Sequence, residues 1–219
     1  MNFDPNIINM SIVQLYGKWK EGYTRKENSL EVRLKSFLLN QRNPDDYYLS
    51  SDGKQVNCKG NVKITDDDLI NGRFPFDFGN VNGYFDCSFC KSLISLKGAP
   101  KKVEGSFSCA NCGMLTSLEN APVMVGGDFF CHDCKGLLSL TGAPKEVDGN
   151  FDCSNCCNLT SLEVAPEKVG GNFLCSNCES LTSLKGVPKD VGGYFSCANC
   201  NSLVSQDDAP KNVGSSFIV

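Results

Sequence analysis

Apolar and polar positions recur with a fixed period of 22 residues over the C-terminal two thirds of this 219-residue chain. Each full unit reads V-x-G-x-F-x-C-x-x-C-x-x-L-x-S-L-x-x-(A/V)-P-x-x, except that Gln206 replaces the last leucine of the sixth unit. One unit cannot bury its own apolar side chains, so stacked units must share a core in which like residues form columns. The pattern predicts a solenoid over residues 81–219, with six full units and a terminal strand that begin at Val81, Val103, Val125, Val147, Val169, Val191 and Val213.

Within a unit, the phenylalanine and the first cysteine are two residues apart, which places them on the same side of a short strand. The residues that flank the phenylalanine then point to the opposite side. A proline in every unit forbids a helix through the return segment. The glycine two residues before the phenylalanine indicates a turn or a close approach between backbones. We therefore expect one strand per unit, with an inner and an outer face.

The segment before the repeats predicts two further parts of the chain. Residues 61–80, with apolar positions such as Val62, Ile64 and Phe76, are interpreted as a degenerate first repeat. Residues 1–60 are interpreted as a small α+β cap, because terminal units of a solenoid are usually atypical. Apolar residues at helical spacing predict a helix over 29–41 and another within 5–22, and residues 51–53 have the composition of a hairpin turn.

The repeat resembles the leucine-rich repeat, especially its cysteine-containing subtype, with the phenylalanine and the two cysteines in the places of the strand leucines and of the Asn/Cys position. The string Leu181-Thr182-Ser183-Leu184, followed by Val187-Pro188 and Val191-Gly192-Gly193, also resembles repeat proteins commonly encoded by bacteriophages. The resemblance covers about residues 81–219. It implies a parallel β-solenoid, leucine-rich-repeat-like, shaped as a horseshoe or a flatter right-handed coil. Phenylalanine and cysteine where leucine usually dominates leave the curvature open.

Twelve of the fourteen cysteines form six C-x-x-C pairs, a spacing that also suits four-cysteine zinc sites. Zinc or disulfides would each join neighbouring units two by two, and the units show no such alternation. We therefore favour reduced thiols that pack in the core, with the second cysteine donating its S–H to a backbone carbonyl, while zinc and disulfides remain alternatives. Cys157 falls outside the columns and is expected to be the most exposed thiol. No metal or other cofactor is expected.

Charge and length restrict the class of partner and the compartment. The net charge is −4 and no basic stripe occurs, which argues against nucleic acid. The chain shows neither a signal-peptide pattern at its start nor an apolar run of about 18 residues. We expect a soluble cytoplasmic protein without a membrane partner, and the host cytoplasm if a phage encodes it.

The sequence offers no convincing catalytic set, and we expect the protein not to be an enzyme. The single histidine, His132, lies next to a strand cysteine, so the two side chains should point to opposite faces. The serine column, represented by Ser183, is better explained by a backbone hydrogen bond repeated in every coil than by six nucleophiles. The acidic run 66–68 is interpreted as a solvated turn.

Variable residues on the outer side of the strands are the candidate site. Unlike the core columns, the positions before and after the phenylalanine differ from unit to unit, and they mix aromatic with acidic side chains, as protein interfaces do. The candidate partner-binding residues are Tyr84, Asp86, Asp128, Phe130, His132, Asp152, Leu174 and Tyr194. We expect a protein partner. The alternatives are surface aromatics that merely cover a sheet, a structural component that self-associates through the edge strand 217–219, and a zinc-stabilised binding module.

Overall fold

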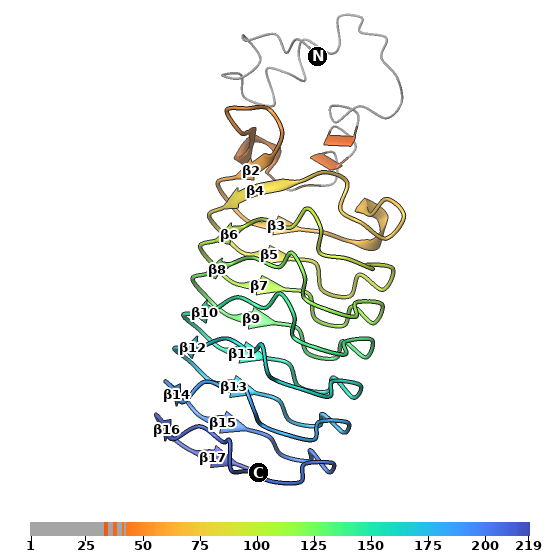
Figure 1. Cartoon of the computed structure of the whole chain (residues 1–219). Helices are drawn as coiled ribbons and strands as arrows, with labels where there is room; N and C mark the ends of the chain where they lie inside the picture. The colour runs from red at the N-terminus through yellow and green to blue at the C-terminus, as the bar shows by residue number, and fades with distance from the viewer. Residues whose placement is uncertain (1–32, 35–36, 39–40, 42) are drawn as a thin grey trace, which may run out of the picture.

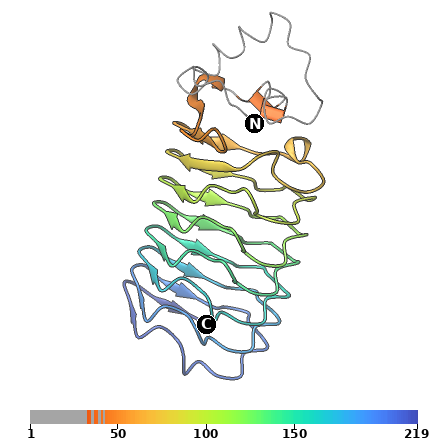
Figure 2. The same ribbon diagram turned by 45° about the horizontal axis from the view of Figure 1, so that its top comes forward.

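The computed structural model describes residues 33–34, 37–38, 41 and 43–219. This part of the chain winds as a parallel β-solenoid, and successive coils stack along one axis (Figure 1). Each repeat contributes one short strand to each of two sheets, which run along two sides of the coil (Figure 2). The expected parallel β-solenoid is therefore confirmed.

The first sheet has nine strands and opens with a hairpin. Its order is β1-β2-β4-β6-β8-β10-β12-β14-β16, and every pair after the antiparallel β1–β2 pair is parallel. The bounds are β1 Tyr47–Leu49, β2 Val56–Cys58, β4 Phe78–Val81, β6 Lys102–Val103, β8 Met124–Val125, β10 Glu146–Val147, β12 Lys168–Val169, β14 Asp190–Val191 and β16 Asn212–Val213.

The second sheet has eight parallel strands, one from each coil. It holds the phenylalanine column, in which each Phe is paired in register with the Phe of the next unit. The bounds are β3 Val62–Lys63, β5 Phe85–Asp86, β7 Phe107–Ser108, β9 Phe129–Phe130, β11 Phe151–Asp152, β13 Phe173–Leu174, β15 Phe195–Ser196 and β17 Phe217–Ile218. The sequence predicted this sheet, but it did not predict the first one, to which the valine that opens each unit belongs.

The core consists of the predicted columns, each stacked on itself. The phenylalanine rings of adjacent coils lie 5.2–5.7 Å apart from Phe85 to Phe217, and most of these pairs are nearly parallel. The two leucines of each of the first five units are buried and close the core on the return side. A coil therefore gains its buried surface from its neighbours, as expected for a solenoid.

The glycine and serine columns have the roles that the sequence predicted. A Cβ on Gly149 would lie 2.8 Å from both the carbonyl carbon and the carbonyl oxygen of Gly127 in the preceding coil, so the close approach of backbones excludes side chains there. All six serines accept a hydrogen bond from the N–H two residues later, at 3.0–3.5 Å. These bonds turn the chain on the return side of each coil.

The N-terminal side of the solenoid is covered by aromatic side chains. Phe37 packs edge-on against Tyr47, Phe76 and Phe78 at 5.3–5.9 Å, and Leu34 and Leu38 are also buried. Residues 33–34 and 37–38 are helical, whereas the rest of the helix expected over 29–41 and all of the one expected within 5–22 lie outside the described residues. The expected turn near residue 52 joins β1 to β2.

The acidic run 66–68 is solvated at Asp66 and Asp67, as expected, but not at Asp68. It forms the 3₁₀ helix η2 (Asp66–Asp68; η1 is Pro44–Asp46), in which Asp68 is buried and its Oδ2 accepts hydrogen bonds from Thr65. Asp66 accepts hydrogen bonds from the N–H groups of Lys91 and Ser92 at 3.1 and 3.0 Å. The run therefore ties the first coil to the second.

Candidate partner-binding face

The outer positions of the eight-stranded sheet form straight columns. The residue after each phenylalanine is paired in register with its counterpart in the next coil, so these side chains are spaced by about 4.8 Å. The column runs Lys63, Asp86, Ser108, Phe130, Asp152, Leu174, Ser196 and Ile218. Charged, small and apolar groups therefore alternate along one line on the surface.

The column before the phenylalanine combines exposure with a structural role. Asp128 Oδ1 accepts hydrogen bonds from the N–H of Asn150 at 2.7 Å and from its Nδ2 at 2.9 Å. Asn150 accepts in the same way from the N–H of Asn172 at 2.7 Å, and Asn172 from that of Tyr194 at 2.9 Å. Each side chain in this ladder holds the next coil in register and still faces outward.

All eight candidate residues lie on this side of the solenoid and reach solvent. Tyr84 is the most exposed, at 44%. The others are partly buried: Asp86, Asp128, Phe130, His132, Asp152, Leu174 and Tyr194. Tyr84 and Tyr194 stand in the same column five coils apart, a separation of about 24 Å at 4.8 Å per strand.

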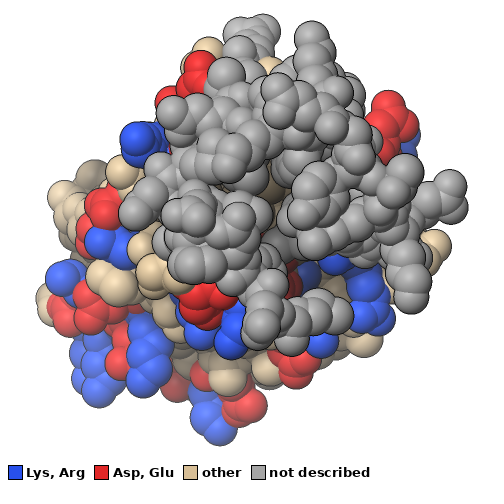
Figure 3. Space-filling model, turned by 90° about the horizontal axis from the view of Figure 1, so that it is seen from above, with Lys and Arg blue, Asp and Glu red and all other residues tan. Residues whose placement is uncertain are grey.

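Within the six full units, the charges on this side have one sign. Charged side chains of both signs stand at the periphery of the coil when it is viewed along its axis (Figure 3). From the glycine to the second cysteine, the six units contain four aspartates and neither lysine nor arginine. We call the outward side chains of these six stretches the cation-free face; its acids are Asp86, Asp128, Asp133 and Asp152.

One carboxylate of this face is already neutralised by the preceding coil. Lys63 forms an ion pair with Asp86, and the N–H of Ser88 donates to the same carboxylate at 2.9 Å. Partial burial works in the opposite direction, but these two donors hold the pKa of Asp86 below its ordinary value. The uncompensated negative charge therefore lies further along the face, around Asp128, Asp133 and Asp152.

His132 stands at the centre of this negative region. Its Nδ1 lies 2.7 Å from Oδ2 of the adjacent Asp133, and its ring meets that of Phe130 edge-on, with 6.1 Å between centroids. The neighbouring sulfurs of Cys131 and Cys134 are buried on the inner side of the strand, as the alternation predicted. The arrangement offers an aromatic and polar contact surface.

The cysteines build the inside of the same strands and turns. All fourteen are free thiols, and Cys157 alone is not buried, as expected. Each second cysteine is placed to donate to a carbonyl oxygen of the preceding coil at 3.0–3.5 Å, which is the role that the sequence suggested. Burial raises the pKa of Cys131 well above 9.0 and that of Cys90 to about 12, so both thiols are protonated at neutral pH.

Phe89 belongs to this face, and the sequence analysis missed it. Its φ is 64°, in the left-handed region, and its side chain is 65% exposed. The equivalent residues of the other units are Asn or Asp, which tolerate this conformation. A bulky aromatic residue in a column of Asn and Asp was the available signal, because a strained and exposed position of this kind is often tied to function.

Comparison with protein-family models, curated proteins and solved structures found no significant match. In the described part of the chain, no helix is both long enough and apolar enough to cross a bilayer.

Proposed function

We propose that the protein is a non-catalytic binding module whose cation-free face holds a basic, extended segment of a partner protein. One observation carries the proposal: four aspartates and no lysine or arginine occur on the outer stretches of six repeats in a chain that has 21 lysines and arginines elsewhere. The core columns of these repeats are nearly uniform, whereas the outer columns vary, which favours a role for the outer residues in recognition.

The chemistry of the face suits lysine and arginine side chains. Carboxylates of Asp128 and Asp152 attract cations, and exposed aromatic rings such as Tyr84 bind them through cation–π contacts. A nucleic-acid backbone would meet only negative charge here. Solenoids commonly bind partners along extended faces of this kind.

The sequence resemblances support the rest of the proposal. The leucine-rich-repeat-like pattern is typical of protein-binding solenoids, and the likeness to phage-encoded repeat proteins suggests a phage origin and a host or phage protein as target. Fourteen free thiols suit a reducing compartment, which supports the cytoplasm, and the host cytoplasm for a phage protein.

A second candidate function is structural. In β17 the side chain of Ile218 is 44% exposed, and Phe217 is only partly covered by its stack on Phe195. Strand edges with apolar side chains pair readily with other chains. An Ile218→Lys variant that removes concentration-dependent oligomers would favour this function.

The binding proposal can be tested with substitutions borrowed from neighbouring coils, which preserve the fold. Tyr84→Asn, Phe130→Ser and Tyr194→Asn install residues that occupy the same columns in other units. The control carries Ile94→Thr, Leu138→Thr and Val204→Thr on the return side, where Thr116, Thr160 and Thr182 occupy the same column. Affinity capture from host lysate should recover a partner with the control and the wild type and lose it with the first triple variant.

A direct probe then tests the charge. A short fluorescein-labelled peptide rich in Lys and Arg should bind the wild type at low salt, and an Asp128→Asn, Asp152→Asn variant should bind it at least tenfold more weakly. A Glu-rich peptide of the same length should not bind. Equal binding of the basic peptide by wild type and variant would refute the proposal.

A further inference from the structure

The third repeat, residues 125–146, presents a large or charged side chain at every outer position of the cation-free face. These positions hold Asp128, Phe130, His132 and Asp133, whereas each of the other five repeats has serine or alanine at one or more of them. Regular alternation would turn Asp133 inward. Its φ of 59° lies in the left-handed region instead, and its carboxylate reaches back to His132. The third repeat therefore carries the densest row of functional groups on this face.

The chain is extended along the whole of this row. The N–H groups of Phe129, Cys131 and Asp133 donate to carbonyl oxygens of the next coil at 2.7–2.9 Å. Donation by every second N–H places the outer side chains of the row at intervals of about 6.7 Å, or two residues at about 3.3 Å each. An extended segment of another chain has the same spacing between alternate side chains. A segment that lies along this strand therefore matches its outer positions one for one, whereas along the solenoid axis the interval is about 4.8 Å.

Three carboxylates in and beside this row keep one oxygen that accepts no hydrogen bond from any described residue. They are Asp128 and Asp152, which accept only at Oδ1, and Asp133, which contacts His132 only through Oδ2. Asp128 stands at the start of the row and Asp133 at its end, while Asp152 is the register neighbour of Phe130 in the adjoining coil. Each successive outer position thus offers a carboxylate oxygen to a cation.

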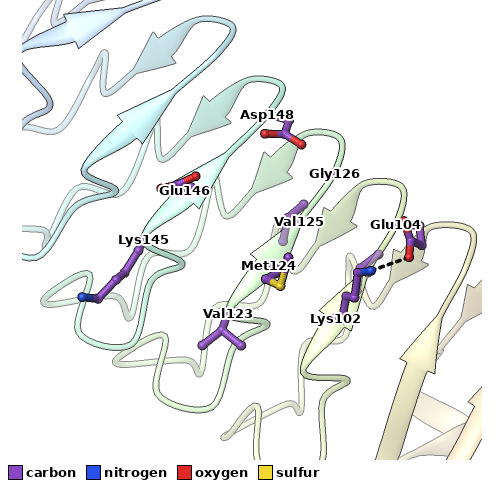
Figure 4. Close-up of a pocket in the computed structure, with 10 residues that line it drawn as sticks. Lys102, Glu104, Val123, Met124, Val125, Gly126, Lys145, Glu146 and Asp148 are labelled. Atoms are coloured by element: carbon purple, nitrogen blue, oxygen red, sulfur yellow. Dashed lines mark ion pairs between the residues drawn. The ribbon is translucent and has the colours of Figure 1, made fainter.

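The other sheet does not share this arrangement. The strands of the nine-stranded sheet and the turns that follow them carry charges of both signs, and Figure 4 shows Lys102 and Lys145 among Glu104, Glu146 and Asp148. Lys102 Nζ lies 2.7 Å from Oε1 of Glu104. A basic segment would meet like charges on that sheet, which makes it the place for control substitutions.

We propose that the third repeat binds a basic segment with Lys or Arg at positions i, i+2 and i+4, extended along the strand. This inference rests on the proposed function and specifies the sequence pattern that the face recognises. Two of the cations pair with Asp128 and Asp133 at the ends of the row. The middle one pairs with Asp152 and lies against the Phe130 ring, which adds a cation–π contact. Other parts of the partner remain free to contact the rest of the face.

Two fluorescein-labelled peptides of identical composition test the proposal by fluorescence anisotropy at low salt and at about pH 8, where histidine is uncharged. In the alternating peptide, three arginines are separated by single serines, so all three can face the sheet. In the contiguous peptide the three arginines are adjacent, and only two can face the same side of an extended chain. The wild type should bind the alternating peptide about fivefold more tightly, which corresponds to one additional exposed ion pair.

Asp133→Asn should abolish this preference. It installs the residue that occupies the same column as Asn111 and Asn155, so the fold is preserved. The alternating peptide should bind this variant about fivefold more weakly, whereas the contiguous peptide keeps two carboxylates for its two facing arginines. Asp190→Asn, on the nine-stranded sheet, removes the same charge and installs the residue found at Asn212 in the same column. This control should bind both peptides like the wild type.

The outcomes separate the binding pattern from the proposed function. Equal binding of both peptides by the wild type, or a preference that persists in Asp133→Asn, would overturn the alternating pattern and leave the basic partner in place. Failure of both peptides to bind would overturn both proposals. Equal losses in Asp133→Asn and Asp190→Asn would reveal an effect of net charge alone and would also overturn the pattern. Coincident melting curves of the variants would show that the fold is unchanged.

Discussion

The thiol of Cys112 donates a hydrogen bond to the carbonyl oxygen of Cys87 in the preceding coil, with 3.2 Å between Sγ and O. The same bond recurs along the solenoid at an offset of 25 residues. This offset is one repeat plus the three residues of the turn. Each turn is thereby tied to the strand below it, and the second cysteine does more than fill space.

Replacing one of these donor cysteines should destabilise the fold far more than replacing the partly buried cysteine that follows it in the sequence. Cys156 is fully buried and donates to the carbonyl of Cys131 at 3.3 Å, whereas Cys157 is only partly buried. We expect Cys156→Ala to lower the free energy of unfolding by about 1–3 kcal/mol, because a buried carbonyl loses its donor. Cys157→Ala should change it by less than about 0.5 kcal/mol. Urea denaturation measures both, and equal effects would contradict the assigned role.

Two glycines, one inside the glycine column and one outside it, give a second matched pair of variants. Gly149→Ala would force a Cβ against the backbone of Gly127, so we expect a loss of at least about 1–3 kcal/mol in urea denaturation. A Cβ on Gly113 would meet nothing within 4 Å, and its φ lies outside the left-handed region. Gly113→Ala should therefore be neutral or stabilise the fold by up to about 1 kcal/mol. A tolerated Gly149→Ala would show that the coils do not approach as closely as described.

Two substitutions at Asp128 should distinguish the hydrogen bond that its side chain accepts from the negative charge that it carries. In Asp128→Asn the amide oxygen can still accept the N–H of Asn150, as Asn150 itself accepts that of Asn172. We expect this variant to keep its thermal stability and Asp128→Ala to lose about 1–2 kcal/mol. Both variants should bind a basic peptide more weakly, since both lack the carboxylate. A stability loss in Asp128→Asn as large as that in Asp128→Ala would argue against the ladder.

Alkaline pH should unfold the protein cooperatively. Burial raises the pKa of Cys90 to about 12 and that of Cys197 to about 11, from an ordinary value of 9.0. A thiol with a raised pKa in the folded state contributes its full stability below pH 9, and this contribution falls as the pH rises from there towards the folded pKa. Between pH 9 and its pKa in the folded state, each such thiol lowers the free energy of unfolding by about 1.4 kcal/mol per pH unit.

The measurement is a pH titration that follows circular dichroism and thiolate absorbance together. We expect the two signals to change together above pH 9, because thiolates form as the core opens. Thiolate absorbance that rises near pH 9 without loss of ellipticity would contradict burial of the thiols.

The sequence predicted the columns better than the sheets. Phe151, Cys153 and Leu159 could be assigned to the core because identical residues at a fixed period can stack only on themselves. The nine-stranded sheet was missed because strands such as Lys102–Val103 place a single valine in the core, whereas the Phe-x-Cys alternation marks the eight-stranded sheet. Its presence depends on pairing between coils, which no single unit encodes.

The outer residues were predicted as a set, but their individual roles were not. Alternation placed Asp128 and Phe130 outside, yet it could not reveal that Asp128 accepts a backbone N–H from the next coil. Phe89 was overlooked because its left-handed φ depends on the turn between the cysteines. The absence of lysine and arginine from these stretches was visible in the sequence and gained meaning only once the stretches were shown to share one side.

Because the repeat is a uniform 22 residues, distances between outer residues along the cation-free face are whole multiples of the spacing between coils. Tyr84 and Tyr194 are separated by a whole number of coils, so gain or loss of one unit through recombination moves them apart or together by about 4.8 Å without turning either ring away from the surface. Gain or loss of a unit would therefore change the length of partner that the face can contact in fixed steps. The core would be preserved, because the residues of each buried column are alike on both sides of the point where a unit is added or removed.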